Sequence, residues 1–191
     1  MNTQVVVAVP APIKFVVQDD QREADLAELC ELTRPGGRID VDAFDCVVPI
    51  PNPFELKTTS KGGVSTARDL GYKHLEKWSK RYWIIADFIK HAQGYTFTTI
   101  WFLAPEHMAE WFQTIRERLD RDRDVTERAV VAMIAGGLSN EDIERIRYLC
   151  SEGAKLNDPN IPKGYVRKHG IPVIENHAKN IRELVKQYPL T

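Results

Sequence analysis

One stretch of the chain combines residue types that bind phosphate. Residues 57–71 read "KTTSKGGVSTARDLG" and bring lysine, hydroxyl side chains and two adjacent glycines together. A Walker-type loop needs the order GxxxxGK[ST], because its backbone N–H groups wrap the phosphates and its lysine follows the last glycine. Here Lys61 precedes both glycines, so the order does not fit. The stretch is therefore predicted to be a solvated loop, with an anion contact or a simple helix cap near Ser65 or Thr66 as alternatives.

The histidines form no metal-binding or catalytic motif. None of the five makes HxxxH, HExxH or HxH. His107 has Glu106 beside it and Glu110 three residues on, but a metal held there would need further ligands from elsewhere in the chain. No GxSxG, catalytic-cysteine or GxGxxG signature is present. The sequence predicts no cofactor and no metal, and it favours a binding protein over an enzyme, with a catalytic site assembled in space left open.

Composition points to the class of protein. The chain has 191 residues, a net charge of −1 and an ordinary share of hydrophobic residues. Its longest apolar runs are too short to cross a membrane, and the first residues do not resemble a secretory signal. Cys30, Cys46 and Cys150 make no CxxC pair, so we interpret them as free thiols. These features predict a cytoplasmic protein with no membrane association.

Charge is unevenly distributed along the chain. Residues 18–45 carry a net charge of −6, whereas residues 57–90 and 145–186 each carry +5. Such segments are usually solvated faces, but they can also bind partners of opposite charge. The candidate acidic partner surface consists of Asp19, Asp20, Glu23, Asp40 and Asp42. The candidate contacts to an anion or nucleic acid are Lys57, Lys61, Arg68, Lys73, Lys163, Arg167, Lys168, Lys179 and Arg182.

Strands and helices alternate in the first 120 residues. Short β-branched runs predict strands at 4–9, 13–17 and 38–50, the last one stopped by the prolines that follow. Leucines at spacing three predict a helix over 25–32. The run 95–103 is rich in threonine and aromatic residues, and we expect a strand there.

Longer helices are expected on both sides of that strand. Leu75, Trp78, Tyr82, Ile85 and Ile89 step by three and four, which predicts a helix over about 66–93 that ends at a glycine. A second helix should begin at the proline of position 105 and run to about 119.

The chain beyond residue 124 is predicted to be wholly helical. Capping-box patterns at 124–127 and 139–142 predict two helix starts, and Pro172 is expected to begin the last helix. We place the boundary near 120–125, giving an α+β domain at 1–122 and a helical subdomain at 123–191.

Two segments resemble known families. Pro49 and Pro51, followed by Thr99, Trp101 and Pro105, resemble the ferredoxin-like domain of small phage and conjugative-element proteins over about residues 13–115. That resemblance implies a mobile-element origin and a fold, because function in the family is largely unknown. The segment 138–186 is similar to helix-turn-helix modules of the resolvase kind, with "KHGI" (168–171) as the turn, which implies DNA reading.

Together these patterns predict an α+β fold. A small, mainly antiparallel sheet of three or four strands should be covered on one face by long helices, with a helical C-terminal part packed against it. The leading hypothesis is a non-catalytic phage or mobile-element protein that docks on a host protein or nucleoprotein complex, with inhibition of host defence as one such role. The alternatives are a nucleic-acid-binding protein that uses the basic helices at 57–90 and 145–186, and a small enzyme.

Overall fold

The computed structural model describes residues 18–33, 43–44, 52–67, 70–151, 156 and 159–190. Within them, helix α1 (Gln18–Leu29) precedes strands β1 (Ala43–Phe44), β2 (Pro53–Thr59) and β3 (Gly63–Val64). Helix α2 (Tyr72–Trp78), strands β4 (Tyr82–His91) and β5 (Gly94–Leu103) and helices α3 (Pro105–Ala135) and α4 (Asn140–Ser151) follow. The chain then forms β6 (Ile161–Pro162), α5 (Lys163–His169), β7 (Ile171–Val173) and α6 (His177–Gln187).

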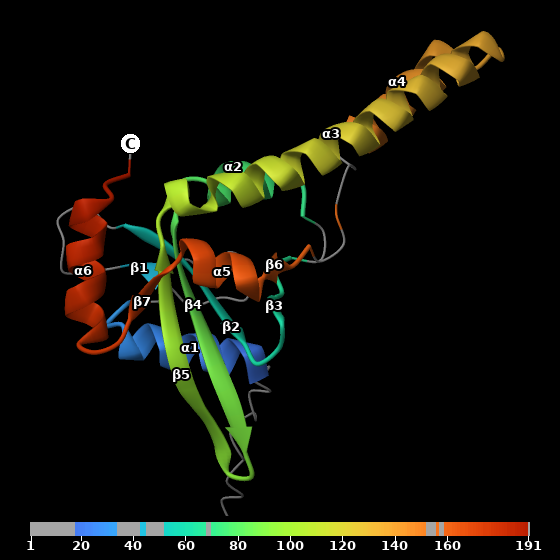
Figure 1. The fold of residues 1–191 in the computed structure, drawn as a ribbon. Coiled ribbons are helices and arrows are strands. Elements are labelled where there is room, and N and C mark those ends of the chain that lie inside the picture. Colours follow the sequence, from blue (N-terminus) through green and yellow to red (C-terminus); the bar gives the residue numbers. More distant parts are fainter. Residues whose placement is uncertain are drawn as a thin grey trace, which may run out of the picture.

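The main sheet has the strand order β1-β2-β4-β5-β7 in the described part of the chain. Strands β2 and β4 run parallel, and the other neighbouring strands are antiparallel. The short strands β3 and β6 form a separate antiparallel pair. The expected α+β class, with a mainly antiparallel sheet and C-terminal helices, is confirmed (Figure 1).

Helices cover both faces of the main sheet, whereas the sequence led us to expect cover on one face. Side chains of α1 and α6, including Leu26 and Ile181, pack on one face, which we call the α1 face. Helices α2, α3 and α5 pack on the other, the α3 face. A β-bulge between Asp87 and Phe88 of β4 changes the alternation of β5, so Phe97 and Ile100 both face α1 although they are three residues apart.

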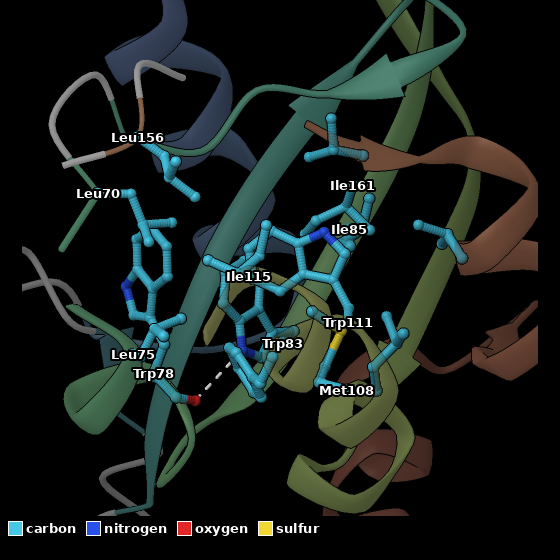
Figure 2. Packing of buried hydrophobic residues seen from close by; sticks show 14 of the residues in the cluster. Leu70, Leu75, Trp78, Trp83, Ile85, Met108, Trp111, Ile115, Leu156 and Ile161 are labelled. Carbon is cyan, nitrogen blue, oxygen red and sulfur yellow. Dashed lines mark hydrogen bonds between the residues drawn. The ribbon is translucent and has the colours of Figure 1, made fainter. Parts of the chain in front are cut away.

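The core on the α3 face is built from indole rings. Trp83 is fully buried, and its ring centroid lies 5.2 Å from that of Trp78 and 6.3 Å from that of Trp111. The Trp83 indole N–H donates to the backbone carbonyl oxygen of Trp78 at 3.4 Å (Figure 2). Around this group lie Leu75 of α2 and Met108 of α3, both buried. The rings therefore join α2, β4 and α3 into one packing unit.

The predicted helix over 66–93 is wrong. Among the described residues of this span, only 72–78 are helical, and the chain then enters strand β4, in which every residue from Tyr82 to Phe88 is buried. A strand covered on both faces is apolar at successive positions and therefore also matches helical spacing. Gly94 does not end a helix; it begins β5 with a φ of +148°, a conformation suited to glycine, directly after the turn from β4.

The candidate phosphate stretch is ordered by contacts rather than solvated throughout. Its first residues form the end of β2, and β3 pairs with β6. The Thr59 hydroxyl donates to the carbonyl oxygen of Gly63 at 2.7 Å and accepts from the backbone N–H of Lys61 at 3.1 Å. No helix begins at Ser65 or Thr66, since α2 starts at Tyr72, so the predicted helix terminus at these residues is wrong.

Two other helix predictions are corrected in the C-terminal half. Helix α3 continues without a break from Pro105 to Ala135, so no new helix starts at 124–127. Residues 171–173 form strand β7 on the edge of the sheet, and the last helix starts at His177 instead of Pro172. The turn of a helix-turn-helix module is therefore replaced by the end of α5 and by β7. The division at residue 122 remains a prediction.

The N-terminal predictions are tested only in part. Helix α1 includes most of the expected span 25–32 but begins at Gln18 and ends at Leu29. Within the expected strand 38–50, β1 occupies residues 43–44. The strands expected at 4–9 and 13–17 and the prolines of the ferredoxin-like resemblance at 49 and 51 lie outside the described residues. Strand β2 was missed, although Pro53 stands at its first residue, where proline is tolerated.

Candidate interaction surfaces

Helices α3 and α4 form an arm that projects from the body of the molecule (Figure 1). The first half of α3 is anchored to the α3 face, where Met108, Trp111, Phe112, Ile115 and Leu119 are buried. Beyond Leu119, the described buried side chains of the two helices are Val130 on α3 and Ile143 on α4. We define the arm as residues 120–151. Its described side chains make few buried contacts and are largely exposed.

The middle of α3 is stabilised by charges rather than by a core. Residues 116–128 contain five arginines and five acids, so this part, the shaft, has no net charge. Within it, the Arg123 guanidinium lies 3.3 Å from the Asp120 carboxylate. Asp120 also accepts a hydrogen bond from the Tyr72 hydroxyl of α2 at 2.7 Å. Opposite charges three or four residues apart each stabilise a helix by a few tenths of a kcal/mol, about 0.2–0.5, which explains how α3 extends past its last large core contacts.

The end of the arm is apolar and exposed. Residues 129–138, "AVVAMIAGGL", contain no charged or hydrogen-bonding side chain, and we call them the tip. In the tip, the exposed fractions are 60% for Val131, 45% for Met133, 41% for Ile134 and 37% for Leu138. An uncharged helix surface that is neither buried nor mixed with polar residues is typical of an interaction site. None of the candidate site residues predicted from the sequence lies on this surface.

The predicted anion-binding residues do not form one surface. Lys57 contacts Glu55 at 2.9 Å and Glu23 at 3.5 Å, Lys163 contacts Asp87 at 2.9 Å, and Arg182 contacts Glu31 at 3.0 Å. These three bases are therefore engaged with acids of the same chain. The side chains of Lys61, Lys73, Arg167, Lys168 and Lys179 are exposed, but they are spread over the β2–β3 turn, α2, α5 and α6. Because α5 and α6 cover opposite faces of the sheet, their bases do not share one face. Arg68 lies outside the described residues.

The predicted acidic surface is described only at Glu23, which pairs with Lys57. The side chains of Asp19 and Asp20 and the whole of Asp40 and Asp42 lie outside the description. Burial disfavours the Lys57 ammonium, but the neighbouring carboxylates of Glu55 and Glu23 outweigh it and raise the pKa of Lys57. Lys57 is thus a structural cation of the fold.

Replacing Lys57 should therefore destabilise the protein. In Lys57→Met the two carboxylates lose their counter-ion in a partly buried site, and we expect the free energy of unfolding to fall by about 2–4 kcal/mol. Lys61→Met, at an exposed position of the adjoining turn, should change it by less than about 0.5 kcal/mol. Urea denaturation followed by circular dichroism measures both; equal small changes would show that the ion pairs of Lys57 contribute little.

Two histidines, His74 and His107, lie in the first turn of a helix and accept hydrogen bonds from backbone N–H groups. The Nδ1 atom of His107 accepts a hydrogen bond from the backbone N–H of Ala104 at 3.1 Å, and His74 does the same for Gly71 at 3.3 Å. A ring nitrogen that accepts an N–H has its lone pair engaged, so His107 can offer a metal only the other nitrogen, which bears the proton in the neutral ring. Among the described residues, no three side chains of the metal-binding types form a group that could hold a metal ion.

His107 should make stability depend on pH. Burial lowers its pKa, Glu106 opposes this shift, and His169 reinforces it. The unfolded chain therefore takes up a proton first as the pH falls below about 6.5, so the stability from the Ala104 hydrogen bond, about 1 kcal/mol, is present at pH 7 and is lost on acidification through the lowered pKa. His107→Asn keeps an acceptor that does not titrate. Denaturation at pH 7.5 and 5 should show a smaller loss for this variant than for the natural chain; equal losses would contradict the assignment.

Cys30 does not offer a nucleophile. It is buried against α1 and the sheet, and burial raises the pKa of its thiol to about 12. At neutral pH the side chain is therefore a protonated, apolar core residue. The side chains of Cys46 and Cys150 are not described.

Comparisons with known proteins do not assign the chain to a family. No protein-family model matches it, and no curated protein matches it.

Among the described helices, none combines the length and the apolar character needed to cross a lipid bilayer.

Proposed function

We propose that this protein is a non-catalytic binding protein whose tip docks on another protein. The observation that carries the proposal is the exposure of four large apolar side chains, Val131, Met133, Ile134 and Leu138, at the end of a projecting arm. Burying such side chains contributes about 25 cal/mol per Å² of apolar surface, so the tip gains most from a partner with an apolar recess. The neutral shaft holds the tip away from the body and adds no net repulsion against a charged partner.

The source of the partner is part of the proposal. The resemblance of residues 13–115 to phage and conjugative-element proteins supports the proposal that the partner is a protein or nucleoprotein complex of a host cell's cytoplasm. Occupying a functional recess of that partner would inhibit it, and inhibition of host defence is one such role. Direct nucleic-acid binding is less well supported, because Lys57, Lys163 and Arg182 are engaged in ion pairs with acids of the same chain.

Site-specific photo-crosslinking in a host lysate tests this function. A photoreactive phenylalanine analogue at Met133 should give a covalent adduct with one predominant protein. The same analogue at Glu117, an exposed residue on the shaft of the same helix, should give none. The purified partner should then bind the chain in solution. Adducts only between two copies of the chain, or equal adducts at both positions, would contradict docking of the tip on a different protein.

A further inference from the structure

A cavity of about 420 Å³ lies on the α1 face of the sheet, between the end of α1 and the start of α6. No aspartate, glutamate, lysine or arginine lines it, and six of its nine lining residues are apolar: Leu29, Phe97, Ile100, Pro172, Val173 and Ile174. Its volume falls within the range of pockets that bind ligands, roughly 300–1,000 Å³. The cavity can therefore accept one apolar group of a binding partner.

The floor and walls of this cavity are held in place by contacts within the chain. On the floor, Ile100 of β5 and Val173 of β7 are both buried and lie opposite each other in the sheet. The two walls are joined, because the Arg182 guanidinium of α6 lies 3.0 Å from the carboxylate of Glu31, just after α1. A binding partner therefore meets a site that is already formed, which lowers the cost of association.

The rim of the cavity exposes further apolar surface. Ile174 is 79% exposed and Leu29 is 42% exposed, so both side chains extend from the cavity into solvent. A small molecule that fills the cavity would leave the outer parts of these two side chains in water. A protein segment covers them as well, and exposed apolar surface around a hollow is typical of protein interaction sites. The rim therefore favours a protein over a small molecule.

The surroundings of the cavity are negatively charged. Glu28 precedes Leu29 and Glu175 follows Ile174; both side chains are exposed, and neither carboxylate makes a hydrogen bond or ion pair with a described residue. More widely, residues 25–33 contain three acids and no base, and residues 171–187 contain two acids and three bases, which gives a net charge of −2. Residues of a partner that lie beside the inserted apolar group should therefore be basic.

We propose that this cavity binds a segment of another protein in which one apolar side chain is flanked by lysine or arginine. The apolar side chain enters the cavity and contacts its floor, the neighbouring backbone covers Leu29 and Ile174, and the basic side chains lie beside Glu28 and Glu175. The cavity selects for an apolar group and the two carboxylates select for positive charge. This surface is separate from the tip and does not depend on the proposed function of the arm.

The test uses the full-length ¹⁵N-labelled chain at low ionic strength, where exposed charges act most strongly. The probes are three tripeptides with blocked ends: Lys-Phe-Lys, Glu-Phe-Glu and Lys-Ala-Lys. Lys-Phe-Lys should shift the backbone amide signals of residues 97–100 and 173–177 in nuclear magnetic resonance spectra at millimolar concentration. Glu-Phe-Glu should bind at least about fivefold more weakly, because attraction becomes repulsion. Lys-Ala-Lys should bind at least about tenfold more weakly, because little apolar surface is buried.

The proposal is overturned if Lys-Phe-Lys does not shift these signals, or if either of the other peptides binds as tightly. The first result would show that the cavity does not accept the group, and the second would show that charge or apolar contact has no part in selection. The tip variant Val131→Asp/Ile134→Asp should bind the peptides normally, so this result is independent of whether the tip docks on a partner.

Charge reversal beside the cavity provides the matched control. Glu175→Lys should weaken the binding of Lys-Phe-Lys at least about threefold and strengthen that of Glu-Phe-Glu. Glu141→Lys makes the same change at an exposed position of α4 and should change neither affinity. Ile174→Asn, at a position too exposed to support the core, should weaken both phenylalanine peptides. Equal effects of the two charge reversals would mean that only the net charge of the chain matters, which contradicts a site at the cavity.

Discussion

The double variant Val131→Asp/Ile134→Asp should bind the docking partner at least about 100-fold more weakly than the natural chain. Two exposed apolar side chains become charged, and each carboxylate would have to lose water in the apolar contact that we propose for the tip. Losing two central contacts of about 2 kcal/mol each is enough for this effect. The exposed fractions of 60% and 41% mean that the unbound fold loses little packing. Isothermal titration calorimetry with the purified partner measures the change.

The matched control for this variant is Arg121→Asp. It introduces an aspartate at an exposed position of the same helix, on the shaft rather than on the tip. We expect its affinity to stay within about threefold of the natural value, and the circular dichroism spectra of all three chains should agree closely, because aspartate costs a helix only about 0.6 kcal/mol relative to alanine. Equal weakening by the control would mean that helix content, not apolar contact, determines binding.

Trp83→Ala should cause the largest loss of stability, about 3–5 kcal/mol. The indole of Trp83 is fully buried between Trp78, Trp111 and Phe112, and it carries a hydrogen bond to the carbonyl oxygen of Trp78. Its removal leaves a cavity among rings from α2, β4 and α3, which are too rigid to close it. Urea denaturation followed by far-ultraviolet circular dichroism measures the loss.

A smaller change at the same position keeps this prediction testable if the alanine variant does not fold. Trp83→Phe retains an aromatic ring but removes the indole N–H, so it should cost about 1–2 kcal/mol. A cost below about 0.5 kcal/mol for Trp83→Phe, together with less than about 1.5 kcal/mol for Trp83→Ala, would show that this ring group does not organise the core.

Elements were predicted correctly from the sequence where their residue pattern alone indicates the structure that they adopt in the fold. Strand β5 is rich in threonine and aromatic residues, which alternate over residues 95–98, and α3 begins at a proline in its first turn, as expected. The residues of β4 match a helix instead, because a strand buried on both faces does not alternate apolar and polar residues. Its run Tyr82–Ile85 is aromatic and β-branched, which favours a strand, and the apolar residues beside the supposed stripe, Trp83 and Phe88, were the sign of two buried faces.

The C-terminal strand could not be predicted from local pattern. Proline is common in the first turn of a helix, but Pro172 is the middle residue of β7 and lies opposite Trp101 on the edge of the sheet. Proline is tolerated in an edge strand where its missing N–H is not needed. Residues 171–173 form a strand because they pair with the edge of β5, about 70 residues earlier in the chain. A prediction from neighbouring residues alone cannot include that edge.

The candidate site residues depend on tertiary contacts that the sequence does not show. Charge counts selected Lys57 and Lys163 as anion contacts, but sequence does not show that Glu55 and Asp87 already pair with them. The tip had a readable pattern, since ten uncharged residues follow the charged shaft without the polar face that a surface helix needs. The solvent exposure of the tip could not be predicted from the sequence, because it depends on where α3 stops packing against the sheet.

Amide hydrogen exchange on the purified complex of the chain and its crosslinked partner tests the docking claim most directly. Exchange in peptides that cover residues 125–138 should slow at least about tenfold on binding, because a docked helix opens less often. The hairpin end at residues 89–95 serves as the internal reference and should be unchanged. Unchanged exchange at the tip in a complex that is demonstrably formed would contradict the account.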